Sequence, residues 1–195
     1  MLKADKRESI LNAATRAFER LGFRKTSMGQ IAERAGVGKG TIYLACKSKE
    51  DLFYQVILRD LQAFITKQAS TIDPRLPADQ LLEKLATESI DHLEKRTLIR
   101  WLISGTLALE LPNWADRFEE LRMLSRQNIS QIIRLGISQG RFRADLAVEE
   151  TAELLYDLQF ASYVLYLRTG RKRGDDLRAK NKRGIELILR GLLAR

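Results

Sequence analysis

Hydrophobic positions recur about every three to four residues along most of this chain, which is the spacing of one helix face. Over residues 5–21 they form one stripe that ends at Gly22, a residue type that commonly terminates helices. The alternation of β-branched residues that is typical of strands is missing. The pattern therefore predicts an all-α fold of about nine helices. Besides the first helix and two short ones within 27–46, the predicted helices lie near 49–70, 78–95, 97–109, 113–139, 147–168 and 176–194.

Residues 27–46 predict two short helices joined by a glycine turn. Ser27 can cap the first helix, and Gln30 can complete a capping box three residues later. Gly36 supplies the backbone freedom that a helix end commonly needs. The second helix, roughly 39–46, starts with small and basic residues that let its end approach DNA closely. This is the outline of a helix-turn-helix, which places its second helix in the DNA major groove.

The segment GVGKGT at 36–41 also resembles the phosphate-binding loop of a nucleotide kinase. Such a loop needs a glycine where this chain has Glu33, and a serine or threonine directly after the lysine, where it has Gly40. It also needs a preceding strand, whereas the preceding segment has helical periodicity. The phosphate-loop interpretation is therefore rejected.

The charge of the chain suits a polyanionic partner, because its 195 residues carry a net charge of +9. Residues 1–60 hold 12 lysines and arginines against 7 aspartates and glutamates, and residues 61–167 hold 12 against 15. Residues 168–195 are basic again, with 10 against 3. Only the first basic segment contains a DNA-reading motif. The basic stretch 168–183 is either a solvated surface or a second contact to DNA or a partner.

The single cysteine and the single histidine argue against several chemistries. Cys46 excludes an internal disulfide and suits a reducing cytoplasm. It could be a redox trigger, but a small thiol is more often a core filler. His92 has no set of partners for catalysis or metal binding. No signal-peptide pattern opens the chain, and no apolar run approaches the roughly 20 residues of a membrane span. We therefore expect a soluble, cytoplasmic protein that is not an enzyme, with no metal, cofactor or membrane partner.

A proline-paired break, IDPRLP at 72–77, marks the predicted boundary between two parts of the chain. Residues 1–50, with the start of the linking helix 49–70, would form a DNA-reading head, and residues 71–195 a larger helical body. The last two helices carry apolar faces that either complete the core of the body or pair with a second copy.

Five spaced motifs in the first 53 residues are similar to the DNA-binding domain of the TetR family of bacterial transcriptional regulators. In order they are RESILxAAxxxF, GFxKTSM, IAERAGV, KGTIY and SKEDLF. The resemblance implies an Ω-shaped homodimer on a palindromic operator whose half-sites lie about 34–36 Å apart, or a multiple of that. It also implies that 71–195 is an effector-binding and dimerisation domain. That domain would bind an unidentified small molecule and dimerise through the helices near 147–168 and 176–194.

The resemblance also implies roles for individual residues of the head. Thr26, Tyr43, Lys47 and Lys49 match positions that usually meet the DNA backbone, and Lys39, Thr41 and Leu44 are candidates to contact base edges. The chain departs from the family in having Gly38 where serine or threonine is common, and Tyr43-Leu44-Ala45-Cys46 where a second aromatic is common. The complete predicted DNA-binding set is Thr26, Ser27, Gly38, Lys39, Gly40, Thr41, Tyr43, Leu44, Lys47 and Lys49.

Bulky side chains at helical spacing in the body are the candidates to line a mainly apolar ligand pocket, although most must be core. They are Trp101, Leu102, Leu109, Trp114, Phe118, Met123, Tyr156, Phe160 and Tyr163. Glu88, Glu110 and Asp157 are either counter-ions for a cationic effector or surface carboxylates. The leading hypothesis is a repressor that releases its operator when a small molecule binds the body. The alternative is a ligand-independent DNA-binding structural or cell-cycle protein with the same fold.

Overall fold

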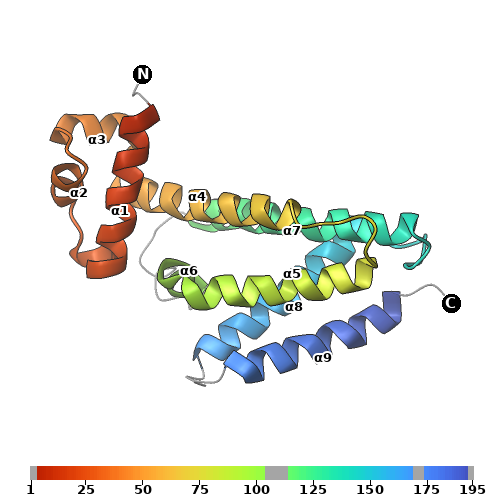
Figure 1. Cartoon of the computed structure of the whole chain (residues 1–195). Helices are drawn as coiled ribbons and strands as arrows, with labels where there is room; N and C mark the ends of the chain where they lie inside the picture. The colour runs from red at the N-terminus through yellow and green to blue at the C-terminus, as the bar shows by residue number, and fades with distance from the viewer. Residues whose placement is uncertain (1–3, 104–113, 169–173, 193–195) are drawn as a thin grey trace. The chain divides into compact units, whose positions relative to one another are not determined.

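The computed structural model describes residues 4–103, 114–168 and 174–192, which form α-helices joined by loops (Figure 1). The all-α prediction is confirmed. Residues 104–109 of the predicted helix 97–109, which include Leu109, lie outside the described residues. Glu110 lies outside them as well. The described helices are α1 (Ala4–Lys25), α2 (Met28–Arg34), α3 (Lys39–Ala45), α4 (Lys49–Ala69), α5 (Ala78–Lys95), α6 (Thr97–Ile103), α7 (Trp114–Ser138), α8 (Val148–Arg168) and α9 (Gly174–Leu192).

The chain divides into two compact units, Met1–Leu61 and Gln62–Arg195. The first unit is called the head and the second the body. The division falls inside α4, so this helix contributes to both units. The proline-paired loop at 72–77, which the sequence pattern suggested as a boundary, lies beyond this point and connects α4 to α5.

The head is built around three phenylalanine rings from α1 and α4. Phe53 packs edge-on against Phe18 and Phe23, with ring centroids 5.2 and 5.4 Å apart. The helical conformation of α1 is interrupted at Gly22, whose φ of 79° is readily adopted only by glycine. The interruption turns Phe23 back into the core, where it is buried.

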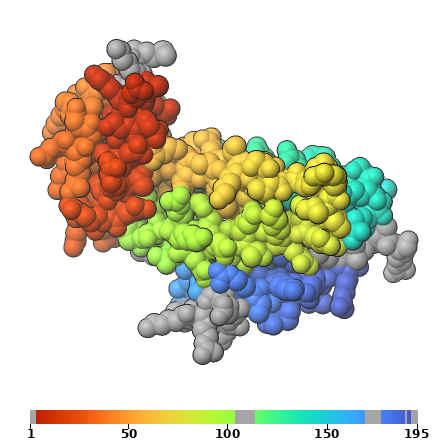
Figure 2. All heavy atoms as spheres, viewed as in Figure 1, coloured from red at the N-terminus to blue at the C-terminus, as the bar shows by residue number. Residues whose placement is uncertain are grey.

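The body has a core of aliphatic side chains contributed mainly by α5 and α7. The space-filling view shows α9, in blue, lying against the yellow-green α5 (Figure 2). Arg178 of α9 anchors this contact through ion pairs with Asp91 (2.8 Å) and Glu94 (2.6 Å) of α5. One apolar cluster of the body contains Ala78, Leu81, Leu82, Leu85, Ile129, Ile132, Ile133, Phe142 and Ala152.

The end of α7 is fixed by a close approach that only glycine permits. Gly136 lies so close to the buried Phe142 ring that a Cβ added at Gly136 would be 2.1 Å from a ring carbon. Gly140, with φ of 66°, then ends the helix turn, as the sequence pattern predicted.

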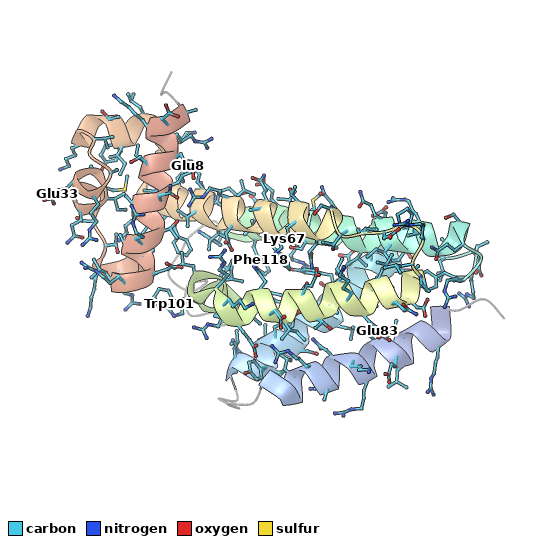
Figure 3. The ribbon with its side chains drawn as sticks, viewed as in Figure 1. Glu8, Glu33, Lys67, Glu83, Trp101 and Phe118 are labelled. Atoms are coloured by element: carbon cyan, nitrogen blue, oxygen red, sulfur yellow. The ribbon has the colours of Figure 1, made fainter. Side chains whose placement is uncertain are left out.

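Two buried amide side chains hold the body half of α4. Asn128 of α7 donates a hydrogen bond to the backbone oxygen of Ile65 (2.9 Å), and Gln68 of α4 donates one to that of Leu85 in α5 (3.1 Å). In the head, Arg59 of α4 donates to Glu8 (2.7 Å) of α1, which Figure 3 labels. Each half of α4 is therefore tied by polar contacts to the unit that it belongs to.

Candidate DNA interface and body cavity

The turn between α2 and α3 is held by local hydrogen bonds. Ser27 and Gln30 form the predicted capping box, in which the Ser27 hydroxyl accepts from the Gln30 backbone N–H (3.2 Å) and the Gln30 side chain accepts from that of Ser27 (3.0 Å). Gly36 has a φ of 66°, which explains why the turn uses glycine. Ser9 of α1 donates to the backbone oxygen of Ala35 at 3.0 Å and fixes the turn against α1. The two helices predicted within 27–46 are thus present and are joined by a turn that these contacts hold.

Helix α3 is anchored on one side and exposed on the other. Ile42 is fully buried in the head, and Gln55 of α4 donates to the backbone oxygen of Ala45 at 3.1 Å. On the outer side, Tyr43 is 50% and Leu44 75% exposed, unusual values for such large apolar groups. Lys39, one turn earlier, is exposed as well. An exposed, chemically varied helix face on a fixed support is what reading a DNA groove requires.

Most of the predicted DNA-binding residues lie on the surface of the head. Thr41 is half-buried, and those that are exposed are Ser27, Gly38, Lys39, Gly40, Tyr43, Leu44 and Lys47. The missing hydroxyl at Gly38 has a structural consequence, since α3 starts without any side-chain hydrogen bond at its N-cap.

Two of the predicted contacts to the DNA backbone involve side chains that also bind backbone oxygens inside the head. Thr26 is buried, and its hydroxyl donates to the backbone oxygens of Gly22 (2.8 Å) and Ala17 (3.3 Å). The Lys49 ammonium donates to those of Phe23 (3.0 Å) and Thr26 (3.1 Å) and lies 4.4 Å from the centre of the Phe23 ring. Both residues therefore close the interrupted end of α1. The sequence match placed them near DNA but carried no signal of this internal use.

Cys46 fills a gap in the head core. The thiol is buried and donates to the backbone oxygen of Ile42 at 3.4 Å. Burial raises its pKa from 9.0 to about 11, and the nearby Asp51 carboxylate adds to the effect. A thiol with so high a pKa is a poor nucleophile at neutral pH, so the core-filler interpretation is the better one.

The body contains a cavity of about 480 Å³ between α5, α7, α8 and α9. Eight of the nine bulky residues predicted to line a pocket lie within the described residues, and none of these eight is among its walls. Its lining residues are Leu82, Leu85, Ala86, Ile129, Leu155, Leu158, Gln159, Ser162, Lys180, Asn181, Arg183, Gly184, Ile185, Leu187 and Ile188. Helical periodicity identifies the inward face of each helix, but it does not say where two inward faces fail to meet, and so it missed these residues.

The eight described pocket candidates lie elsewhere in the body. Phe160 contacts Phe118 and Tyr156, with ring centroids 5.5 and 6.0 Å apart. Trp101 on α6 and Phe118 on α7 are labelled in Figure 3. Met123 is 59% exposed and lines a second, polar hollow. Leu102, Trp114 and Tyr163 are buried.

Of the three carboxylates considered as counter-ions, Asp157 and Glu88 lie within the described residues. Asp157 accepts a hydrogen bond from Arg122 at 2.5 Å, so its charge is already balanced within the body. Glu88 is half-buried on α5 and lies at a hollow of only about 10 Å³. His92 stacks on Phe64 with ring centroids 4.0 Å apart. Within the described ranges, no cluster of side chains suits a metal ion, and no helix is apolar and long enough to cross a membrane.

The head geometry defines a helix-turn-helix DNA-binding protein. A family model described as bacterial regulatory proteins of the tetR family matches residues 10–56, which include α2, α3 and the start of α4. Curated relatives that share this region are named transcriptional regulators or repressors. The chain therefore carries the DNA-binding domain of the TetR family of transcriptional regulators. This family consists of regulators, not enzymes.

Two curated relatives illustrate how the similarity is distributed. The uncharacterized HTH-type transcriptional regulator YhgD of Bacillus subtilis is 38% identical over 76 residues, which are 39% of this chain and 40% of YhgD. The HTH-type transcriptional repressor KstR2 of Rhodococcus jostii is 25% identical over 198 residues, which are 97% of this chain and 92% of KstR2.

A solved structure shares the whole fold. The regulator FadR of Bacillus subtilis, in complex with stearoyl-CoA, superposes with a TM-score of 0.76 over 95% of this chain and 98% of FadR, at 21% sequence identity. The similarity at this level of identity concerns the fold.

Proposed function

We propose that this regulator is a homodimeric repressor that binds a palindromic operator in the cytoplasm and releases it when a small molecule occupies the body. The observation that carries the proposal is the outer face of α3, where Lys39, Tyr43 and Leu44 are exposed on a helix whose opposite side is fixed by Ile42. Members of the family bind DNA operators, act as dimers and bind small-molecule effectors.

The dimer part of the proposal is supported by exposed leucines on the last two helices. Leu154, Leu158 and Leu165 of α8 are more than half exposed, and their spacing places them on one helix face. Leu187 of α9 is 68% exposed, and both Leu158 and Leu187 also line the body cavity, which therefore opens on this same face of α8 and α9. Apolar side chains exposed in a stripe commonly mark a protein interface. These residues lie within the segments 147–168 and 176–194, through which the sequence resemblance implies dimerisation.

The ligand part is supported by the cavity of the body. Its volume of about 480 Å³ is within the range of small-molecule sites, about 300–1,000 Å³. A cavity too small for an organic molecule would favour the ligand-independent alternative. This cavity is large enough to hold one. The structural relative FadR holds stearoyl-CoA, and the relative KstR2 is named a repressor.

Coupling between ligand and DNA would run through α4, which belongs to both units. A ligand changes DNA affinity only if it binds the two conformations of the protein with different affinities. The buried amides of Gln68 and Asn128 connect α4 to the helices of the body, so a ligand that moves α5 or α7 also acts on α4.

The experiment is to select random-sequence duplexes on the purified protein and then to titrate the selected operator complex with candidate effectors. We expect a palindromic consensus and an operator complex that dissociates when an effector binds the body. An operator complex that persists with every ligand shown to occupy the body would contradict ligand-induced release.

A further inference from the structure

We propose that a second copy of the chain closes the cavity of the body by packing its own α8 antiparallel against α8 of the first copy. The two-fold axis of this pair passes between Leu158 and Ala161. The inference rests on the proposed function, because it gives the proposed dimer a register and makes the cavity a site that one chain leaves incomplete.

An exposed stripe runs the length of α8. Its members follow one another at intervals of three or four residues, so they lie on one face of the helix. They are Glu150, Leu154, Leu158, Ala161, Leu165 and Arg168. The three leucines are 64%, 54% and 53% exposed, so a single chain leaves an apolar strip in water. A strip with this spacing is typical of a helix that packs against another helix.

The apolar middle of the stripe is complementary to itself in the antiparallel direction. When the axis lies midway between Leu158 and Ala161, Leu158 faces the partner's Ala161, and Leu154 faces the partner's Leu165. The small side chain of Ala161 lets the two helices approach closely beside the axis. A two-fold contact requires a surface that fits its own copy, and this order of side chains supplies one.

The charged ends of the stripe fix the direction of the pair. In the antiparallel pair Glu150 faces the partner's Arg168 at each end, about 13 Å from the axis at the rise of an α-helix. A parallel pair would instead place each charge against its own copy. Helix α9 suits the axis less well, because its exposed face carries Lys180, Arg183 and Arg190, and pairing it with its own copy would bring cations together.

The same pairing covers the mouth of the cavity. Leu158 lines the cavity and lies within two residues of the proposed axis, about 2 Å along the helix. Ser162, one turn later, lines it as well. Because the exposed Leu187 of α9 is also a lining residue, the cavity opens between α8 and α9 on the face that the second copy covers. The two cavities therefore face each other near the axis, and α8 of each copy closes the cavity of the other.

Closure is tested with a cysteine on the cavity wall. We expect iodoacetamide to modify Ser162→Cys at least about tenfold more slowly in the dimer than in a Leu154→Glu, Leu165→Glu monomer, whose helix content circular dichroism verifies. Ser138→Cys, exposed at the end of α7 and outside the lining, should react equally fast in both proteins. Both serine hydroxyls donate to backbone oxygens of their own helices, so the substitutions are matched. Peptide mass spectrometry separates these cysteines from the buried Cys46.

The direction of the pair is tested by reversing the charges at the ends of the stripe. Glu150→Arg and Arg168→Glu should each raise the dimer Kd about tenfold, because each places like charges at both ends of the pair. The double variant Glu150→Arg, Arg168→Glu should return the Kd to within about threefold of the wild-type value. The two residues lie about 27 Å apart along one helix, so they cannot compensate each other within a chain. Sedimentation equilibrium measures the three values.

Cross-linking with a short bis-maleimide locates the axis. Ala161→Cys, beside the axis, should cross-link to its own copy. Ala147→Cys, exposed just before α8, would lie about 37 Å from its copy in the antiparallel pair and should not cross-link. A parallel pair would cross-link both.

Three results would overturn the inference: equally fast modification of Ser162→Cys in dimer and monomer, no recovery in the charge-reversed double variant, or cross-linking of Ala147→Cys as readily as Ala161→Cys. Each can occur in a dimer that binds its operator, so the proposed function would stand. A wild-type chain that sediments as a monomer would contradict the proposed dimer as well as the inference. A closed dimer whose operator complex persists with every bound ligand supports the inference and contradicts ligand-induced release.

Discussion

Lys47 and Lys49 lie two residues apart, but their side chains have different surroundings in the head. Lys49 turns inward, where it closes the end of α1 through three backbone oxygens and the face of Phe23. Lys47 is exposed, and its backbone N–H donates to Asp51 at 2.9 Å. Charge alone would assign both lysines to DNA, whereas the contacts assign one to stability.

This difference predicts unequal effects on stability. Lys49→Ala removes charged hydrogen bonds to backbone oxygens and should lower the free energy of unfolding by about 2 kcal/mol. Lys47→Ala should change it by less than about 0.5 kcal/mol, as exposed substitutions usually do. Urea denaturation of the two variants measures both values. Equal stability of the two variants would show that the Lys49 contacts do not matter.

A second pair of lysines separates sequence reading from electrostatic attraction. Lys39→Ala should cost about 1–3 kcal/mol on the selected operator and relax specificity at one base position. Lys47→Ala should weaken binding to all duplexes alike and reduce the slope of log affinity against log salt by about one. Binding isotherms on operator and scrambled duplexes at several salt concentrations measure these effects. A uniform loss for Lys39→Ala would remove it from the base-reading set.

The burial of Cys46 predicts low reactivity. With a pKa of about 11 against 9.0 for a free thiol, the folded protein holds about a hundredfold less thiolate at pH 8 than the unfolded chain. Because the folded pKa is the higher one, the contribution of this group to stability is complete below pH 9 and is lost as the pH rises through 11. Iodoacetamide at pH 8 should therefore modify the native protein slowly and the urea-unfolded protein quickly. Fast modification of the native protein would reopen the redox hypothesis.

At the scale of helices, the sequence pattern was informative because helix ends depend on local chemistry. The capping box of Ser27 and Gln30 and the turn at Gly140 are set by neighbouring residues, and both were predicted. The helix-turn-helix and its exposed face came from the same local signals. The cavity could not be predicted from such local signals, because it depends on how α9 packs against α5 and α8. That packing is set by contacts between residues far apart in the sequence, such as Arg178 with Asp91.

The close approach of Gly136 and Phe142 gives a prediction for the joint after α7. Gly136→Ala places a methyl group inside the van der Waals radius of the ring and should destabilise the body by about 1–3 kcal/mol, despite the better helix propensity of alanine. Gly29→Ala in α2 is the control, since the nearest atom would be 3.9 Å away. Thermal unfolding compares them. Addition of Phe142→Leu to Gly136→Ala should recover part of the loss, and no recovery would mean that the ring is not the cause.

At the scale of the whole molecule, a repressor of this kind needs two heads and therefore a stable contact between bodies. The exposed leucines of α8 give that contact a testable position. Leu154→Glu and Leu165→Glu, which avoid the cavity lining, should produce a monomer and weaken operator binding at least about tenfold. Leu76→Glu, at an exposed leucine outside α8 and α9, should remain dimeric. Sedimentation velocity distinguishes the two outcomes, and a dimeric Leu154→Glu, Leu165→Glu protein would move the interface elsewhere.

The most direct test of the account is the stoichiometry and selectivity of the complex between the protein and its selected duplex. Native mass spectrometry of the full chain with the palindromic duplex should show two chains on one duplex, and a duplex with one half-site scrambled should bind far more weakly. A single chain per duplex, or equal binding to any duplex offered, would contradict the reading of DNA by paired α3 helices.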